Sequence, residues 1–131
     1  MESSGSSSVH AARDAGGPAG AGQSAKIRRG RDLRAALSTG VRLHGRRVVV
    51  YVLPRDQGLR AGFICGRGVG SAVDRNRARR LLKEAWRALE PEVSSGFDVV
   101  FVARSEIRGA RMGEVESDMR SVLATAGVIK P

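Results

Sequence analysis

Five cations fall within nine residues of this chain, from Arg75 to Lys83, in the stretch Arg75-Asn76-Arg77-Ala78-Arg79-Arg80-Leu81-Leu82-Lys83. The planar guanidinium of arginine matches phosphate oxygens with two parallel hydrogen bonds and gives up its hydration more readily than lysine does. Only Asp74 and Glu84 oppose these cations, whereas a solvated helix face normally mixes charges of both signs four residues apart. The spacing therefore favours binding of a polyanion, and nucleic acid is the partner that it indicates, over an ordinary solvated face.

The cations are carried by a predicted amphipathic helix from about Asp74 to Leu89. Its apolar residues recur at spacings of three and four and define a core stripe: Ala78, Leu81, Leu82, Ala85, Trp86 and Leu89. At about 100° per residue, the side chains opposite that stripe are Asn76, Arg80, Lys83 and Arg87. Arg75 and Arg79 flank the stripe on one side and Arg77 on the other, so the helix is expected to turn its cations outward.

A glycine-rich approach, Gly66 to Gly70, precedes the helix and carries one more cation, Arg67. Its spacing matches neither the Walker pattern nor the dinucleotide-binding fingerprint, and no Lys-Ser/Thr pair follows. We interpret it as a turn that brings the helix close to the sheet, although exposed backbone N–H groups there could also meet a phosphate.

The positive charge is concentrated in the middle of the chain. The formal net charge is +10, and residues 26–87 carry 17 lysines and arginines against four acids, whereas residues 88–131 carry five against seven. A localised excess of this kind is typical of an electrostatic footprint on phosphate. No apolar run approaches the roughly 18–20 residues of a membrane-spanning helix, and no lipidation signal is found, so no membrane partner is expected.

No set of residues suggests catalysis by the protein itself. Acids such as Asp32, Asp56 and Asp98 are scattered singly, and neither His10 nor His44 is paired with a nucleophile. Metal-assisted hydrolysis needs carboxylates or histidines that converge on a cation. We therefore predict no catalytic residue and no metal-binding residue in this chain, and a stand-alone nuclease is disfavoured.

The chain length of 131 residues predicts one small domain with a tail. Residues 1–25 hold 17 serines, glycines and alanines without a periodic apolar pattern and are predicted to be a disordered tail, with the folded domain at 26–131. Cys65 is the only cysteine and is read as a small buried hydrophobe. The absence of disulfides and of a signal peptide predicts a cytoplasmic protein.

The remaining elements predict an α+β domain with helices on a small sheet. A short edge strand at 26–29 precedes a helix from Arg31 to Thr39. Two apolar runs, 48–53 and 59–65, are separated by a short glycine-containing loop and are predicted to form a hairpin. A strand at 97–103 and a helix at 115–126 complete the order. Tyr51 interrupts an aliphatic strand, and its ring either packs in the core or stacks on a base.

The sequence of the arginine-rich helix and its flanks resembles that of a known family. Residues Gly70 to Trp86, with the core Arg75-Asn76-Arg77, resemble the signature of the bacterial ribonuclease P protein family. The helix at 31–40, the strand ending in Tyr51 and residues 98–104 agree in order and spacing. The resemblance covers about residues 26–129.

The resemblance implies a mixed four-stranded sheet with three helices and a left-handed βαβ crossover, although right-handed crossovers are the general rule. It also implies that the chain is a subunit of an endoribonuclease in which a catalytic RNA, with Mg²⁺ bound mainly by that RNA, removes the 5′ leader from precursor tRNA. The RNA-binding residues that it implies are Arg67, Arg75, Asn76, Arg77, Arg79, Arg80 and Lys83. The leader cleft that it implies, between the first helix and the sheet, contains Leu33, Leu37 and Tyr51.

Two departures from the family pattern concern the leader. Family members often have phenylalanine at the positions of Leu33 and Leu37, so apolar contact replaces stacking there. A Ser-Lys-Lys sequence before the glycine is replaced by Gly66-Arg67-Gly68, which keeps one cation. The alternative function is that of a structural ribosomal or ribosome-assembly RNA-binding protein of related fold.

Overall fold

A computed structural model describes residues 24–130. The predicted tail of residues 1–25 lies outside the described residues except for Ser24 and Ala25, which belong to the folded part. The helices and strands in chain order are β1 (Ala25–Lys26), α2 (Gly30–Thr39), β2 (Val41–His44), β3 (Val48–Pro54), β4 (Leu59–Ile64), α3 (Ala72–Leu89), β5 (Phe97–Ala103) and α4 (Met112–Ala126). Three short 3₁₀ turns, Arg67–Val69, Glu90–Glu92 and Ser105–Ile107, connect them.

The prediction of an α+β domain with three helices on a small mixed sheet is confirmed for the described residues, but the sheet has five strands instead of four. The additional strand, β2, pairs with β3 in antiparallel register from Val41 opposite Val52 to His44 opposite Val49. The predicted strand at 26–29 is shorter, because only Ala25 and Lys26 pair with β4.

The predicted hairpin of residues 48–53 and 59–65 is wrong. The strand order is β1-β4-β5-β3-β2, so β5 lies between the two strands, parallel to β4 and antiparallel to β3. The physical reason is burial: six of the seven residues of β5 are buried, as expected of a central strand covered on both faces. The loop after β3 passes the beginning of β5, where Arg55 N–H donates to the Gly96 carbonyl.

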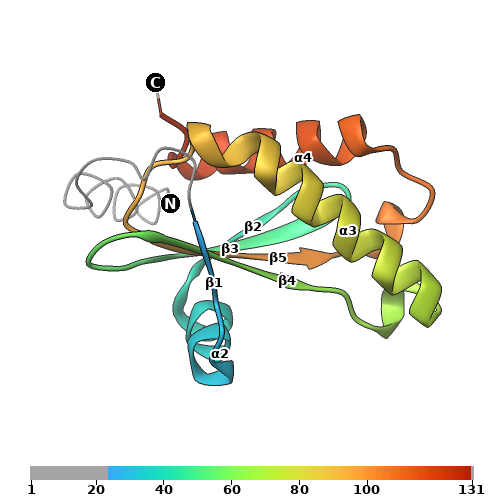
Figure 1. Cartoon of the computed structure of the whole chain (residues 1–131), viewed down its shortest axis with the longest axis horizontal. Helices are drawn as coiled ribbons and strands as arrows, with labels where there is room; N and C mark the ends of the chain where they lie inside the picture. Colours follow the sequence, from blue (N-terminus) through green and yellow to red (C-terminus); the bar gives the residue numbers. More distant parts are fainter. Residues whose placement is uncertain (1–23, 131) are drawn as a thin grey trace.

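The helices cover the two faces of the sheet unequally (Figure 1). α3 and α4 pack together on one face, over a core that includes Leu82, Leu89, Phe101 and Met119. α2 alone lies on the other face, over a smaller cluster around Ile27, Ala36 and Val100. The sheet therefore separates the surface formed by α3 from the surface beside α2.

Candidate nucleic-acid interface

The N-terminus of α3 is fixed by a reciprocal cap. The Ser71 hydroxyl accepts a hydrogen bond from the Asp74 backbone N–H at 3.2 Å, and the Asp74 carboxylate accepts one from the Ser71 backbone N–H at 3.0 Å. The backbone N–H of Ser71, with its hydroxyl, holds the pKa of Asp74 below its ordinary value. Because of this capping box, the helix begins at Ala72, two residues before its predicted start.

The glycine-rich approach forms the tight entry to this cap. Gly70 has φ +135°, and a Cβ atom there would collide with the Asp74 carboxylate. By contrast, a Cβ atom at Gly66 or Gly68 would meet nothing within 4 Å. The requirement for glycine is therefore confined to the residue next to the cap, and Arg67 is exposed on the preceding 3₁₀ turn.

The core stripe of α3 agrees with the prediction. Ala78, Leu82, Ala85, Trp86 and Leu89 are buried, and Leu81 is half-buried. Trp86 packs on Phe101 with ring centroids 5.3 Å apart, which confirms its predicted place in the core.

The cations of α3 fall into two groups. The side chains of Arg80, Lys83 and Arg87 are exposed and make no hydrogen bond or ion pair with another residue of the described range 24–130. We call these three side chains the outer cationic face. They project on the side of the helix away from its buried stripe, where crowding of like charges disfavours the free protein and an anion would relieve it.

The other three arginines of the predicted set make contacts within the protein. Arg75 donates to the Gly70 carbonyl at 2.9 Å, Arg77 to the Ala110 carbonyl at 3.0 Å, and Arg79 to the Asn76 side-chain oxygen at 3.3 Å. A guanidinium has five N–H donors, so each retains donors for a phosphate. Arg77 nevertheless has a structural role, because it ties α3 to the loop that precedes α4.

The predicted cleft residues lie on the opposite face of the sheet. Leu33 and Tyr51 are half-buried in the cluster under α2, and Leu37, one turn further along α2, is 37% exposed. The Tyr51 ring packs in the cluster and remains partly accessible, so its stacking on a base stays a prediction. The structure brings Leu33 and Tyr51 together and leaves Leu37 at the surface.

Arg42 is a neighbour of this surface that the sequence reasoning missed. It lies directly opposite Tyr51 in the β2–β3 register, so both side chains project from the same face of the sheet, and it is exposed. The sequence did not place Arg42 beside Tyr51, because the short strand β2 that carries Arg42 was not predicted.

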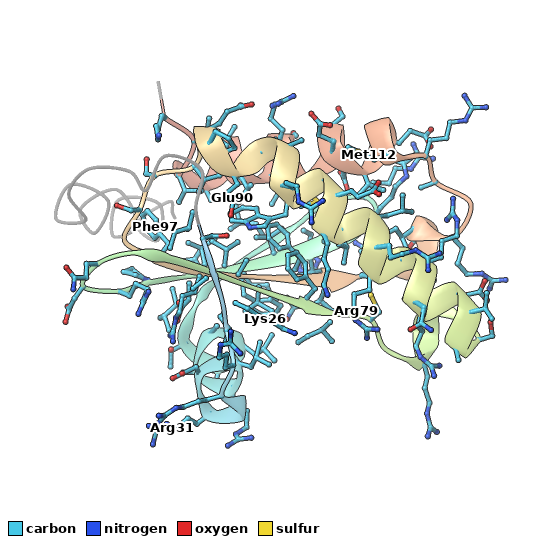
Figure 2. The ribbon with its side chains drawn as sticks, viewed as in Figure 1. Lys26, Arg31, Arg79, Glu90, Phe97 and Met112 are labelled. Atoms are coloured by element: carbon cyan, nitrogen blue, oxygen red, sulfur yellow. The ribbon has the colours of Figure 1, made fainter. Side chains whose placement is uncertain are left out.

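A second cationic cluster surrounds the beginning of α2. The side chains of Arg28, Arg29, Arg31 and Arg34 are exposed and make no hydrogen bond or ion pair within the described residues. Figure 2 shows Arg31 on the helix that projects from the sheet on the side opposite α3. Cations are unfavourable at the positive end of a helix dipole, where acids are usual. Only Asp32 is acidic in the first turn of α2, so the excess of cations there was the sequence signal for this cluster.

The described residues contain no group of three or more His, Cys, Asp or Glu side chains that could hold a metal ion. Cys65 is buried, as predicted, and burial raises the pKa of its thiol against the opposing influence of Arg79. Within residues 24–130, no helix is long and apolar enough to cross a membrane.

Comparisons with known proteins all indicate the same family. The family described as Ribonuclease P matches residues 22–127. The ribonuclease P protein component of Chloroflexus aggregans is 38% identical over 103 residues, covering 77% of this chain and 76% of the relative. That of Thermoanaerobacter pseudethanolicus is 34% identical over 99 residues, covering 75% of this chain and 85% of the relative.

Solved structures share the fold. The ribonuclease P protein from Thermotoga maritima superposes with a TM-score of 0.68 at 23% identity, over 75% of this chain and 94% of that one. The Staphylococcus aureus ribonuclease P protein gives a TM-score of 0.69 at 20% identity, over 82% of this chain and 100% of that one.

Proposed function

The chain belongs to the ribonuclease P protein family, and we propose that, as the protein subunit of this endoribonuclease, it assists a catalytic RNA in removing the 5′ leader of precursor tRNA. The observation that carries the proposal is the outer cationic face of Arg80, Lys83 and Arg87. These cations are exposed on a capped helix and have no acidic partner among the described residues.

The α3 side of the molecule binds ribonuclease P RNA in this proposal. Arg67, Arg80 and Lys83 offer free cations, and Arg75, Asn76, Arg77 and Arg79 offer the polar groups that their internal contacts leave available. A folded RNA presents a dense array of phosphates, and placing cations against it releases condensed counterions. If about five cations contact phosphates, log K should fall against log salt with a slope of roughly −3 to −5.

The α2 side of the sheet contacts the single-stranded 5′ leader. Leu33 and Leu37 supply apolar contact, Tyr51 supplies the ring on which an unpaired base stacks, and Arg42 lies beside that ring. Single-stranded RNA is generally held by this combination of aromatic stacking and nearby cations. The two RNA partners are thus bound on opposite faces of one sheet.

The phosphodiester chemistry is assigned to the RNA subunit. The described residues do not form a group that fits Mg²⁺, so we propose that the metal is bound mainly by the RNA. The protein contributes by neutralising phosphates near the reacting centre and by holding the leader in place.

Reconstitution tests the proposal directly. The purified chain is mixed with ribonuclease P RNA and precursor tRNA at low Mg²⁺, beside reactions that lack either the protein or the RNA. The expected result is faster leader removal with both components and none with the protein alone. RNA binding without faster cleavage would instead indicate a structural RNA-binding protein, and cleavage by the protein alone would contradict the assignment of the chemistry to RNA.

A further inference from the structure

A cavity of about 210 Å³ lies between the edge of the sheet, formed by β1 and β4, and the C-terminal half of α3. Two residues that line it, Lys26 and Glu90, are labelled in Figure 2. Pockets for drug-sized ligands are larger, about 300–1,000 Å³. This cavity therefore suits a group about the size of one planar ring system.

Two aromatic rings line the cavity, Phe63 from β4 and Trp86 from α3. Both contact Phe101 beneath them: Phe63 is stacked on it at 5.6 Å with an interplanar angle of 13°, and Trp86 lies at 5.3 Å. Phe63 is half-buried, so part of its surface remains accessible. The rings are thus held in fixed positions before any ligand arrives, which lowers the entropy cost of binding.

One wall of the cavity is polar. The Trp86 indole N–H donates to the Ser24 hydroxyl at 2.9 Å, and the Ser24 backbone N–H donates to the Glu90 carboxylate at 2.8 Å. The Ser24 hydroxyl also donates to the same carboxylate oxygen. A carboxylate offers about four lone-pair sites, so Glu90 keeps the capacity to accept an N–H group from a ligand.

The rim of the cavity is cationic. Lys26 on β1 and both Lys83 and Arg87 on α3 line it, and all three side chains are exposed. They form no hydrogen bond or ion pair with another side chain in the described part of the chain. The aromatic rings of the cavity match a nucleotide base, and the Glu90 carboxylate can accept a hydrogen bond from the polar edge of that base. The cations around the opening match the phosphate of the same nucleotide.

We propose that this cavity receives one unpaired nucleotide of ribonuclease P RNA, with the base against Phe63 and the phosphate between Lys26, Lys83 and Arg87. The inference rests on the proposed function and deepens it. The source is the RNA subunit and not the leader, because Lys83 and Arg87 also belong to the outer cationic face. Tyr51 and Leu33 lie on the other side of the sheet.

The test fills the cavity without removing charge. Ala25 lines it, is exposed on the edge strand β1, and tolerates a larger side chain as far as strand pairing is concerned. Binding of Ala25→Phe to folded ribonuclease P RNA is measured by filter binding, and the unpaired bases of the RNA are probed with dimethyl sulfate in each complex. Phe63→Leu is a second variant that keeps an apolar side chain and removes the ring. Arg80→Ala is the matched control, because it removes a neighbouring cation that does not line the cavity.

Wild-type protein should protect a base that both cavity variants leave reactive, and both variants should bind the RNA about tenfold more weakly. Arg80→Ala should weaken binding but keep that protection. Thermal melting by circular dichroism establishes that each variant is folded.

Wild-type affinity and an unchanged protection pattern in the folded cavity variants would overturn the inference while leaving the proposed function intact. Loss of binding to a leader oligonucleotide alone would assign the cavity to the leader and equally overturn it. Failure of the wild-type protein to bind ribonuclease P RNA would instead contradict the proposed function.

Discussion

Asp98 holds the guanidinium of Arg60 through two hydrogen bonds, from Nε at 2.8 Å and from Nη2 at 2.7 Å. The two residues are direct neighbours in the β4–β5 register, and Asp98 is only 3% exposed. Arg60 also reaches Asp32 on α2 at 3.4 Å. The hydrogen bonds from Arg60 to Asp98 raise the pKa of that guanidinium. Two central strands, β4 and β5, and the helix α2 are therefore joined by one ionic network.

The network predicts that Asp98→Asn destabilises the protein. The substitution leaves Arg60 partly buried without its main counter-charge, and breaking a buried pair costs about 3–5 kcal/mol. Because the Arg60 side chain is 23% exposed and keeps Asp32, we expect a loss below that range, about 2–3 kcal/mol in the free energy of unfolding. Urea denaturation measures it. Asp56→Asn, in the exposed turn after β3, is the control and should change stability by less than about 0.5 kcal/mol.

The pairing of Arg60 with Asp98 was not predicted from the sequence, although the elements around it were. The periodicity of α3 and the continuous apolar run of β5 identified both elements, since each pattern is local. Arg60 and Asp98 are 38 residues apart, and their pairing depends on the insertion of β5 beside β4. Direct pairing of β3 with β4 needs only a short loop, and the sequence pattern therefore favoured a hairpin. Such a hairpin would have excluded β5 from the place between these two strands, where both of its faces are buried.

The sequence predicted the positions of the α3 cations on their helix but not their contacts with other elements. The outer cationic face followed from angular position on one helix, and Arg80 and Lys83 lie where the pattern placed them. The bond from Arg77 to the Ala110 carbonyl could not be foreseen, because it joins α3 to a loop 33 residues away. Arg42 was missed because β2 has only four residues, of which two are a histidine and an arginine.

Arg80→Ala and Arg77→Ala should therefore behave differently. The Arg80 side chain makes no hydrogen bond or ion pair with another described residue, so its loss should weaken RNA binding, reduce the salt slope by about 1 and leave the melting temperature unchanged. Arg77 donates to the Ala110 carbonyl, so Arg77→Ala should weaken binding and also lower the free energy of unfolding by about 1 kcal/mol. Salt-dependent filter binding and urea denaturation of both variants separate the two effects. Equal stability of the two variants would show that the Arg77 contact contributes nothing.

Gly70→Ala should destabilise the protein by more than about 1 kcal/mol. Its φ of +135° is unfavourable for any residue with a Cβ atom, and the added methyl group would displace the Asp74 carboxylate from its cap. Gly68→Ala is the matched control two residues away, because nothing lies within 4 Å of its Cβ position. Thermal melting compares the two, and a similar melting temperature for both variants would mean that the turn relaxes without strain.

The cap also predicts a pH dependence. The pKa of Asp74 in the folded protein is lowered, mainly by the Ser71 backbone N–H, relative to its ordinary value of 3.8. A lowered folded-state pKa means that the ionised carboxylate stabilises the fold above that ordinary value. The contribution is lost as the pH falls through the folded-state pKa. Asp74→Asn should therefore be less stable than wild type at pH 6, and the difference should shrink below pH 3.8. Urea midpoints measured at several pH values check this, and a constant difference would contradict it.

Leu37→Phe should strengthen the contact with the 5′ leader. Leu37 is 37% exposed beside the cluster that contains Leu33 and Tyr51, so a larger side chain there extends into solvent without disturbing the core. An aromatic ring adds a stacking surface for an unpaired base, worth about 1–3 kcal/mol where the base stacks fully. We expect precursor tRNA with a leader of several nucleotides to bind the reconstituted enzyme about fivefold or more tightly, and mature tRNA to bind as before. Ser38→Phe, at the next exposed position of α2, is the control for added hydrophobicity. A similar gain with Ser38→Phe, or an equal gain with mature tRNA, would place the leader elsewhere.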